Sequence, residues 1–315
     1  MRNCETLVWK PNLSFSVSDI PTPTLPQKTG QEHEEGQPEQ HVRVPLPGLH
    51  IHREQQGMFF TLFLGMYLIT VLGNMIIILL TRLDPHLHTP MYFVLSHLAL
   101  TDVSFSSVTV PKMLMYMQTQ NQSISCAACV TQTFFFLFLG YTDNLLLAVM
   151  AYDRYVAICH PLCYTIIMRE ELCICLLAGS WLLSCADALI HTLLMAKLSF
   201  CDDIIPHFFC DLAAQLKLSC SDTSLNELVL FTAGALVFFF PLTGILVSHG
   251  CIGVSILRVP STKGICKALS TCGSHLSVVS LFYGTIMAQY FSSSPGQSHN
   301  KDIIASVMYT LFTPC

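Results

Sequence analysis

The sequence predicts an all-α polytopic membrane protein, a seven-transmembrane helix bundle whose seventh helix is incomplete. Hydrophobic residues make up 52% of the 315 residues and charged residues only 11%, whereas soluble domains carry about 25% charged residues. The mean hydropathy is +0.55. With 15 Lys and Arg against 20 Asp and Glu, the chain lacks the basic surface that neutralises nucleic-acid phosphates. These observations exclude a soluble enzyme and a nucleic-acid binder, and they make membrane lipid a partner.

Seven apolar runs follow one another along the chain. A helix needs about 20 mostly apolar residues to cross roughly 30 Å of hydrocarbon, and the first six runs reach that length. The seventh run rises only about 20 Å, which is too short to span. The predicted spans are Met58 to Leu80, Met91 to Met117, Cys129 to Ala151, Leu172 to Leu198, Leu228 to Leu257, Ala268 to Phe291 and Ile303 to Cys315.

The first fifty residues form a separate segment. They are polar and rich in proline, and they include an acidic cluster between Glu32 and Glu39. Such a segment cannot bury enough apolar surface to order itself. We therefore expect a disordered tail over residues 1–50 and a membrane domain over residues 51–315.

Several features favour placing the tail outside the cell. In that orientation the inner loops hold six Lys and Arg residues and the outer loops hold four, as the positive-inside rule requires. Arg43 and Arg53 of the tail act against this orientation. Asn12 and Asn121 each begin a glycosylation acceptor sequence, and both would face the lumen. Three cysteines between the fourth and fifth runs also fit an oxidising compartment.

Four motifs occur in a fixed order along the spans. They are Gly73-Asn74 in the first span, Leu87-His88-Thr89-Pro90-Met91-Tyr92-Phe93 at the start of the second, Met150-Ala151-Tyr152-Asp153-Arg154-Tyr155-Val156-Ala157-Ile158-Cys159 at the end of the third, and Lys267-Ala268-Leu269-Ser270-Thr271-Cys272-Gly273-Ser274-His275-Leu276 at the start of the sixth. Residues 46–314 thereby resemble the odorant (olfactory) receptors, a family of rhodopsin-like (class A) G-protein-coupled receptors.

The resemblance implies a receptor that binds a small volatile odorant within the bundle and activates a heterotrimeric stimulatory G protein to raise cyclic AMP. It also implies a multi-pass protein of the plasma membrane with an extracellular N-terminus. The family pairs the cysteines that correspond to Cys129 and Cys210, and to Cys201 and Cys220. Free thiols or another pairing are the alternatives, because Cys126 lies only three residues before Cys129.

The chain departs from the family pattern in two places. The family's seventh helix continues beyond a Thr-Pro like Thr313-Pro314 into an Asn-Pro-x-Ile-Tyr motif, whereas this sequence ends at Cys315. His249 follows Ser248 where the family usually has tyrosine. The first departure leaves open a signalling-incompetent, truncated remnant of the same family as a second interpretation.

The segment Asp153-Arg154-Tyr155 lies at the inner end of the third span. An arginine at a membrane boundary needs a counter-charge or water, and the adjacent Asp153 can supply the charge. The alternative is an arginine that only reaches to the lipid headgroups. By resemblance, Arg154 is the G-protein switch, held inward at rest and released when the helices part.

Two carboxylates, Asp102 and Asp143, lie within apolar spans and must face the bundle interior. Asp102 follows Met91 by eleven residues and Asp143 precedes Arg154 by eleven, which places both about 16 Å from the inner helix ends. Carboxylates at one depth share a proton or bind a cation. With Asn74 nearby, we expect either a sodium ion, which the resemblance favours, or a hydrogen-bonded polar cluster without an ion.

The candidate ligand site lies in the outer half of the membrane. Phe136, Leu137, Gly140 and Tyr141 share one face of the third helix by their spacing. The opposing candidates are Gly234, Val237, Phe238 and Tyr283. Such a site would be apolar with one or two hydroxyls and would suit a small uncharged molecule, although ordinary helix packing uses the same residues. We see no carboxylate on this face, so an amine ligand is not expected.

Other classes of protein find less support in the sequence. Phosphate-binding glycine loops, Gly-x-Ser-x-Gly and His-Glu-x-x-His are all missing, so no enzyme is expected. A transporter or channel would also contain intramembrane carboxylates, but the spans show neither an inverted repeat nor matched broken helices. His207-x-x-Cys210-Asp211 is a weak metal pattern, because Cys210 fits a disulfide better. No cofactor is expected beyond the sodium ion.

Overall fold

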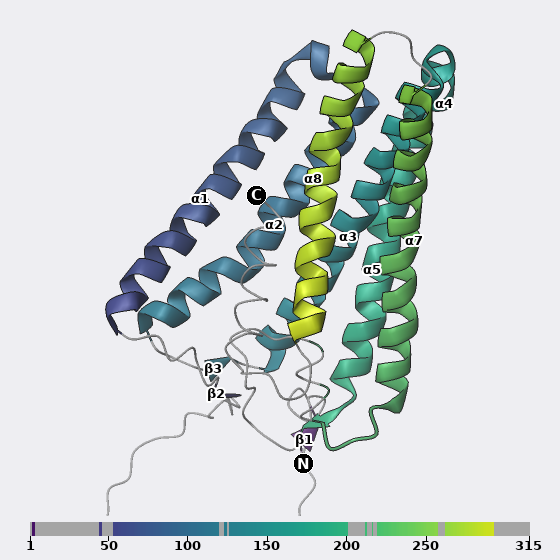
Figure 1. Ribbon diagram of the computed structural model, residues 1–315. Coiled ribbons are helices and arrows are strands. Elements are labelled where there is room, and N and C mark those ends of the chain that lie inside the picture. Colours follow the sequence, from purple (N-terminus) through teal and green to yellow (C-terminus); the bar gives the residue numbers. More distant parts are fainter. Residues whose placement is uncertain are drawn as a thin grey trace, which may run out of the picture.

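The computed structural model is a bundle of long helices (Figure 1). It describes residues 2–3, 44–45, 53–119, 123–124, 126–200, 212, 216, 219–257 and 262–292. Within these ranges, the long helices are α1 (Arg53–Leu83), α2 (Pro90–Thr119), α3 (Cys126–Cys159), α5 (Glu170–Ala196), α7 (Ser224–Leu257) and α8 (Thr262–Ser292). They correspond to the first six predicted spans. The seventh predicted span, residues 303–315, lies outside the described residues.

Five of these helices, α1, α2, α3, α5 and α7, are long and apolar enough to cross a membrane. In α8 the apolar stretch is Cys272–Met287, and the whole helix of 31 residues rises about 46 Å. The largest difference from the predicted bounds is in α3, which continues from Ala151 to Cys159. A helix can extend beyond the hydrocarbon because its polar residues there meet headgroups and water.

Prolines begin the turns that follow α1 and α3. After α1, the 3-10 turn η2 (Pro85–Leu87) is capped by Asp84, whose carboxylate accepts a hydrogen bond from the backbone N–H of His86 at 2.9 Å. After α3, Pro161 begins the 3-10 turn η3 (Pro161–Cys163), and the short α4 (Tyr164–Ile167) follows. Proline lacks the N–H that a continuing helix needs. These turns therefore reverse the chain and bring α4 back against α3.

Helix α3 lies at the centre of the bundle, where it packs against α2, α5 and α7 and also meets α8, while α1 packs on α2. Leu146 of α3 is fully buried. It belongs to a core that draws on five helices: Val94 and Leu98 from α2, Leu146, Leu147 and Met150 from α3, Leu177 from α5, Ile245 from α7, and Val279, Phe282 and Tyr283 from α8. This arrangement turns the side chains of α3 inward along most of its length.

The outer faces of the bundle are strongly apolar. Ile69 of α1, Leu182 of α5 and Phe231 of α7 are 69%, 71% and 78% exposed. A soluble protein rarely exposes so much contiguous apolar surface. These faces fit contact with lipid tails, as the composition requires.

Two short strand pairs mark one end of the bundle. Strand β1 (Arg2–Asn3) pairs antiparallel with β4 (Ser199–Phe200), and β2 (Val44–Pro45) pairs with β3 (Ser123–Ile124). These strands lie opposite the end that carries α4 (Figure 1). We call this strand-bearing end, where α3 begins at Cys126, the disulfide end, and the opposite one the Arg154 end. The tail, expected to be disordered, thus contributes two described dipeptides, and the rest of residues 1–50 lies outside the described residues.

Candidate functional site

At the Arg154 end, Asp153 is almost completely buried. Its carboxylate accepts a hydrogen bond from the Tyr164 hydroxyl of α4 at 2.8 Å. Burial and this hydrogen bond raise the pKa of Tyr164 above its ordinary value, so the hydroxyl keeps its proton and remains a donor. The Asp153 carboxylate is therefore bound to α4.

The sequence predicts that Asp153 supplies a counter-charge to Arg154, and the two side chains interact electrostatically. Within the described part of the chain, no ion pair joins their side chains, and the buried Nε of Arg154 has no hydrogen-bond partner. Arg154 does lie close enough to His275 and Cys272 of α8 to interact with them electrostatically. Tyr155 donates or accepts a hydrogen bond with Nε2 of His160 at 3.1 Å. Arg154 therefore interacts electrostatically both with Asp153 of its own helix and with residues of α8.

Helices α7 and α8 meet at two histidines near Arg154. The rings of His249 and His275 are stacked, with centroids 5.1 Å apart and planes 15° apart. His249 also bonds through Nδ1 to the Ile245 carbonyl at 2.8 Å. Nearly two turns further along α7, Ser255 and Cys159 of α3 are 3.1 Å apart. The histidine that departs from the family pattern therefore takes part in the contact between α7 and α8.

A polar junction in the middle of the bundle joins three helices through Asn144 of α3. Its amide nitrogen donates to the Val237 carbonyl of α7 at 2.6 Å, and its amide oxygen accepts from the Tyr283 hydroxyl of α8. The ring of Tyr283 also meets Phe238 edge to face, with centroids 5.0 Å apart. Asn144 was not predicted from the sequence, although an asparagine inside an apolar span is a signal for such a role.

The candidate sodium residues lie on three successive helices. Asp143 of α3 is 3% exposed and has a buried Oδ1 without a hydrogen-bond partner among the described residues. Asp102 of α2 is half-buried. Asn74 of α1 donates to the Thr70 carbonyl at 3.1 Å. The unpartnered carboxylate oxygen on Asp143 fits a cation or a proton.

The structure divides the predicted ligand residues between neighbouring clusters. Val237, Phe238 and Tyr283 meet at the Asn144 junction. Leu137 and Tyr141 pack with Ala188 and Met195 of α5. The remaining three are Phe136, whose ring is 5.1 Å from Phe105 of α2, Gly140, which is buried, and Gly234, where an added Cβ would meet no atom within 4 Å. The predicted face of α3 therefore turns toward α2 on one side and α5 on the other.

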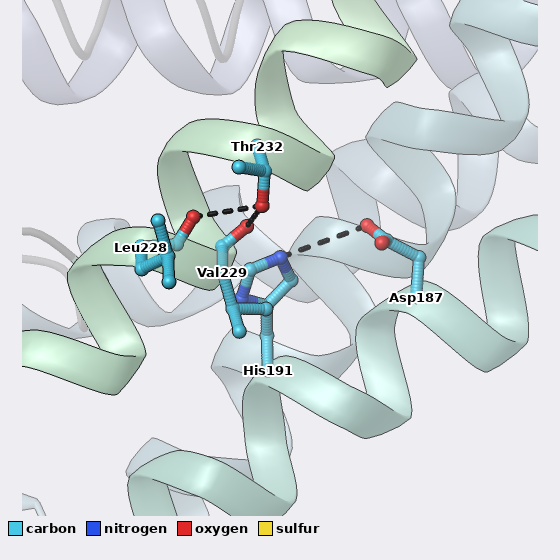
Figure 2. A network of polar contacts seen from close by, with 5 residues as sticks. All are labelled: Asp187, His191, Leu228, Val229 and Thr232. Carbon is cyan, nitrogen blue, oxygen red and sulfur yellow. Dashed lines mark hydrogen bonds and ion pairs between the residues drawn. The ribbon is translucent and has the colours of Figure 1, made fainter.

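A second pair of polar side chains near this region was also not predicted from the sequence. Asp187 and His191 of α5 lie one turn apart, with Oδ2 and Nε2 at 3.8 Å (Figure 2). The His191 side chain is 2% exposed and the Asp187 side chain 17%. The sequence places Asp187 toward the end of the fourth span, but only the packing of α5 shows that it is largely buried.

The structure describes two of the four cysteines that are predicted to form disulfides. Cys129 and Cys220 are both disulfide-bonded. Their predicted partners, Cys210 and Cys201, lie outside the described residues, as do the glycosylation candidates Asn12 and Asn121, whereas Cys126 begins α3. The particular pairing stays a prediction.

A cavity of about 450 Å³ opens between α1, α2 and α5 at the Arg154 end. Arg82, Phe93, Glu170 and Cys173 are among its lining residues. None of the predicted ligand residues lines it. This cavity is therefore separate from the proposed odorant site.

The central α3, the surrounding helices and the buried Asp153 beside Arg154 define the rhodopsin-like receptor class. Squid rhodopsin has a similar fold, with a TM-score of 0.67 over 86% of this chain and 85% of that chain, at 17% identity. The family profile described as "Olfactory receptor" matches residues 63–315. The chain is 70% identical to human olfactory receptor 1J4 over 85% of this chain and 86% of that receptor. It is 66% identical to human olfactory receptor 1J2 and 62% identical to mouse olfactory receptor 1J1, over the same shares.

These similarities show the family directly: the chain belongs to the olfactory receptors. The shared family confirms the resemblance that the four motifs indicated, and the similarity to rhodopsin confirms the fold class. The chain is accordingly a multi-pass membrane protein of the G-protein-coupled receptor class.

The Asn144 junction makes a specific stability prediction. Tyr283→Phe should lower the free energy of unfolding by roughly 0.5–1.5 kcal/mol, the typical value of one hydrogen bond, and Asn144→Leu should lower it further because two bonds are lost. In the Asn144→Leu background, Tyr283→Phe should have little additional effect. Thermal unfolding of the detergent-solubilised chain measures all three variants.

The matched control for this experiment is Tyr152→Phe, because Tyr152 is exposed and should tolerate loss of its hydroxyl. Equal destabilisation by Tyr152→Phe and Tyr283→Phe, or full additivity of the two junction changes, would contradict the proposed coupling.

Proposed function

We propose that the chain is an odorant receptor of the plasma membrane, with its N-terminal tail outside the cell. A small volatile molecule binds within the helix bundle, and the bound receptor activates a stimulatory G protein and raises cyclic AMP. The observation that supports this most is the Asp153-Arg154-Tyr155 end of α3, in a chain that belongs to the olfactory receptors. The proposed mechanism is a two-state equilibrium that ligand binding biases.

The packing at the Arg154 end suggests how the switch works. Asp153 accepts a hydrogen bond from Tyr164, and within the described residues it interacts with Arg154 electrostatically without a direct ion pair. Arg154 also interacts electrostatically with His275 of α8. Outward movement of α8 would therefore release Arg154 toward the cytosol and separate the stacked rings of His249 and His275. In this scheme α4 retains Asp153 while α8 moves.

The proposed coupling predicts the effect of Arg154→Ala. In cells that report cyclic AMP, an odorant that activates the unmodified chain should lose most of its response in this variant, because the group that meets the G protein is missing. Arg169→Ala is the matched control, since Arg169 is exposed and forms an exposed ion pair with Glu171 at 3.7 Å, which contributes little.

Surface labelling of intact cells must accompany this assay. A full response from Arg154→Ala at equal surface expression would overturn the switch mechanism. A loss of response that matches a loss of surface signal would instead indicate a folding defect. In that case Tyr164→Phe, which removes the hydrogen bond to Asp153, provides a milder test of the contacts at the Arg154 end.

For the odorant site we propose Phe136, Leu137, Gly140, Tyr141, Gly234, Val237, Phe238 and Tyr283. Phe238 and Tyr283 provide aromatic surface and one hydroxyl, which suits a small uncharged molecule. Gly234 lies one turn before Val237 on α7, and space is open where its Cβ would stand. A side chain added at this position would extend into the space that we assign to the ligand.

Gly234→Phe tests this assignment. The added ring should raise the odorant concentration for half-maximal response by about tenfold, which corresponds to about 1.4 kcal/mol. The control is Gly244→Phe, since Gly244 lies on the same helix, is exposed, and also has open space at its Cβ position. An unchanged response in Gly234→Phe, or equal effects at both glycines, would place the ligand elsewhere.

We further propose that Asp143 and Asp102, with Asn74, bind a sodium ion. The buried, unpartnered Oδ1 of Asp143 supports this assignment, because a carboxylate in a low-dielectric interior needs a cation or a proton. A sodium ion there would neutralise the carboxylates and hold α1, α2 and α3 together in one state. The rival arrangement is a protonated, hydrogen-bonded cluster without an ion.

Sodium binding predicts salt-specific stability. The melting temperature of the solubilised chain should be higher in sodium chloride than in choline chloride at equal ionic strength, because a ligand of the folded state stabilises it. Asp143→Asn should remove this difference. A melting temperature that does not respond to sodium, or responds equally in Asp143→Asn, would support the protonated cluster.

A further inference from the structure

The cavity between α1, α2 and α5 at the Arg154 end contains none of the residues that we assign to the odorant or to the G-protein switch. Its volume of about 450 Å³ falls within the range of roughly 300–1,000 Å³ that is typical of small-molecule sites. The lining comes from the last turn of α1, the turn η2 and the first two turns of α2 and α5. The cavity is therefore large enough for a ligand and is formed where three helices end or begin.

Three titratable side chains of both signs line this cavity. They are Arg82 in the last turn of α1, His88 directly after η2, and Glu170 at the start of α5. Within the described ranges, none of the three forms a side-chain hydrogen bond or an ion pair. Arg82 interacts electrostatically with His97 of α2, which places its guanidinium on the α2 side of α1. A cation and a carboxylate that share a cavity without pairing are available to a ligand that carries both charges.

The polarity of the lining changes with depth. The candidate membrane spans of α1, α2 and α5 end or begin within two residues of the three titratable side chains, which places these side chains at the level of the lipid headgroups. Phe93 and Ile174 line the same cavity roughly 5–6 Å further into α2 and α5. They are 41% and 56% exposed, so the cavity borders the lipid-facing surface. A site that is charged at headgroup depth and apolar one turn deeper matches a phospholipid, whereas a sterol has no charge to offer.

We propose that this cavity binds an aminophospholipid, with phosphatidylserine as the reference lipid. The Arg82 guanidinium fits the phosphate, because its planar set of N–H donors matches phosphate oxygens. The Glu170 carboxylate fits the primary ammonium, and the exposed His88 fits the serine carboxylate. The first part of an acyl chain lies on Phe93 and Ile174, which are apolar and border the lipid.

A lipid held by Arg82 and Glu170 joins α1 to α5. Because α1 packs mainly on α2, such a lipid adds a second attachment of α1 to the bundle and stabilises the folded chain. In the orientation proposed above, the cavity opens to the cytosolic leaflet, which contains phosphatidylserine. Only this choice of leaflet rests on the proposed function, and the binding itself does not.

The chemistry of the headgroup predicts a selectivity among phospholipids. Phosphatidylethanolamine carries the same phosphate and primary ammonium, so it should also bind. Phosphatidylcholine has no N–H on its ammonium to donate to Glu170, and phosphatidylglycerol has no ammonium at all. These two lipids should therefore require an about tenfold higher concentration, which corresponds to the loss of one hydrogen bond to a charged group.

Native mass spectrometry of the purified full-length chain measures this selectivity. The chain in detergent is titrated with each of the four lipids, and the concentrations that give one retained lipid per chain are compared. Glu170→Gln should remove the preference for phosphatidylserine over phosphatidylglycerol, whereas Glu170→Asp should keep it because the charge remains. The matched control is Glu171→Gln, which removes a charge from an exposed neighbour outside the cavity and should keep the preference.

Arg82→Gln tests the contact with the phosphate. This variant should bind all four phospholipids more weakly, because they share the phosphate. Arg169→Gln should not, since Arg169 is exposed and does not line the cavity. Phosphatidylserine should also raise the melting temperature of the unmodified chain and of both control variants, but not that of Arg82→Gln.

Three results would overturn the assignment of this cavity to an aminophospholipid. They are equal retention of all four phospholipids, equal effects of Glu170→Gln and Glu171→Gln, and displacement of phosphatidylserine by cholesterol at equal concentration. The last result would assign the cavity to an uncharged sterol. None of these measurements involves an odorant or a G protein, so lipid binding and receptor function are tested independently.

Discussion

The structure depends on the polar side chains that α3 buries in an apolar bundle. Asp143, Asn144 and Asp153 are each at most 4% exposed, and the hydrocarbon around the bundle offers no water to satisfy them. Each must therefore find a partner on another helix or bind an ion or a proton. Helices α7 and α8 supply the partners of Asn144, and Tyr164 of α4 supplies that of Asp153. This requirement fixes the rotation of α3 and draws the other helices around it.

The two ends of the bundle are stabilised by different kinds of contact. At the disulfide end, Cys129 and Cys220 are covalently bonded and short strands pair across the connecting segments. At the Arg154 end, the contacts are single hydrogen bonds and ring stacking, such as Tyr164 with Asp153 and His249 with His275. Contacts of the second kind can be exchanged for others at low cost. The contacts at the Arg154 end are therefore the more readily exchanged of the two kinds.

The Asn144 junction joins these two regions. It lies on α3 between the proposed odorant residues and the Arg154 end, and it bonds to α7 and α8 simultaneously. A ligand that displaces the ring of Tyr283 or Phe238 would alter the same contacts that hold α8 against α3. Buried hydrogen bonds between helices are exchanged as discrete alternatives, since leaving one unmade is costly. The junction thus offers a physical route from an occupied pocket to the switch.

The amino-acid sequence alone was sufficient to predict the six long helices and the family. It also predicted that Arg154 and the cysteines lie at opposite ends of the bundle. Apolar run length and fixed local motifs encode these features, and neither depends on which helices are neighbours. The partners of individual side chains were beyond reach: Asp153 meets Tyr164, Asn144 meets Tyr283, and Asp187 lies beside His191 in a buried setting. Helix rotation and packing select these contacts. An apolar span looks alike on every face, because lipid and protein interior favour the same side chains.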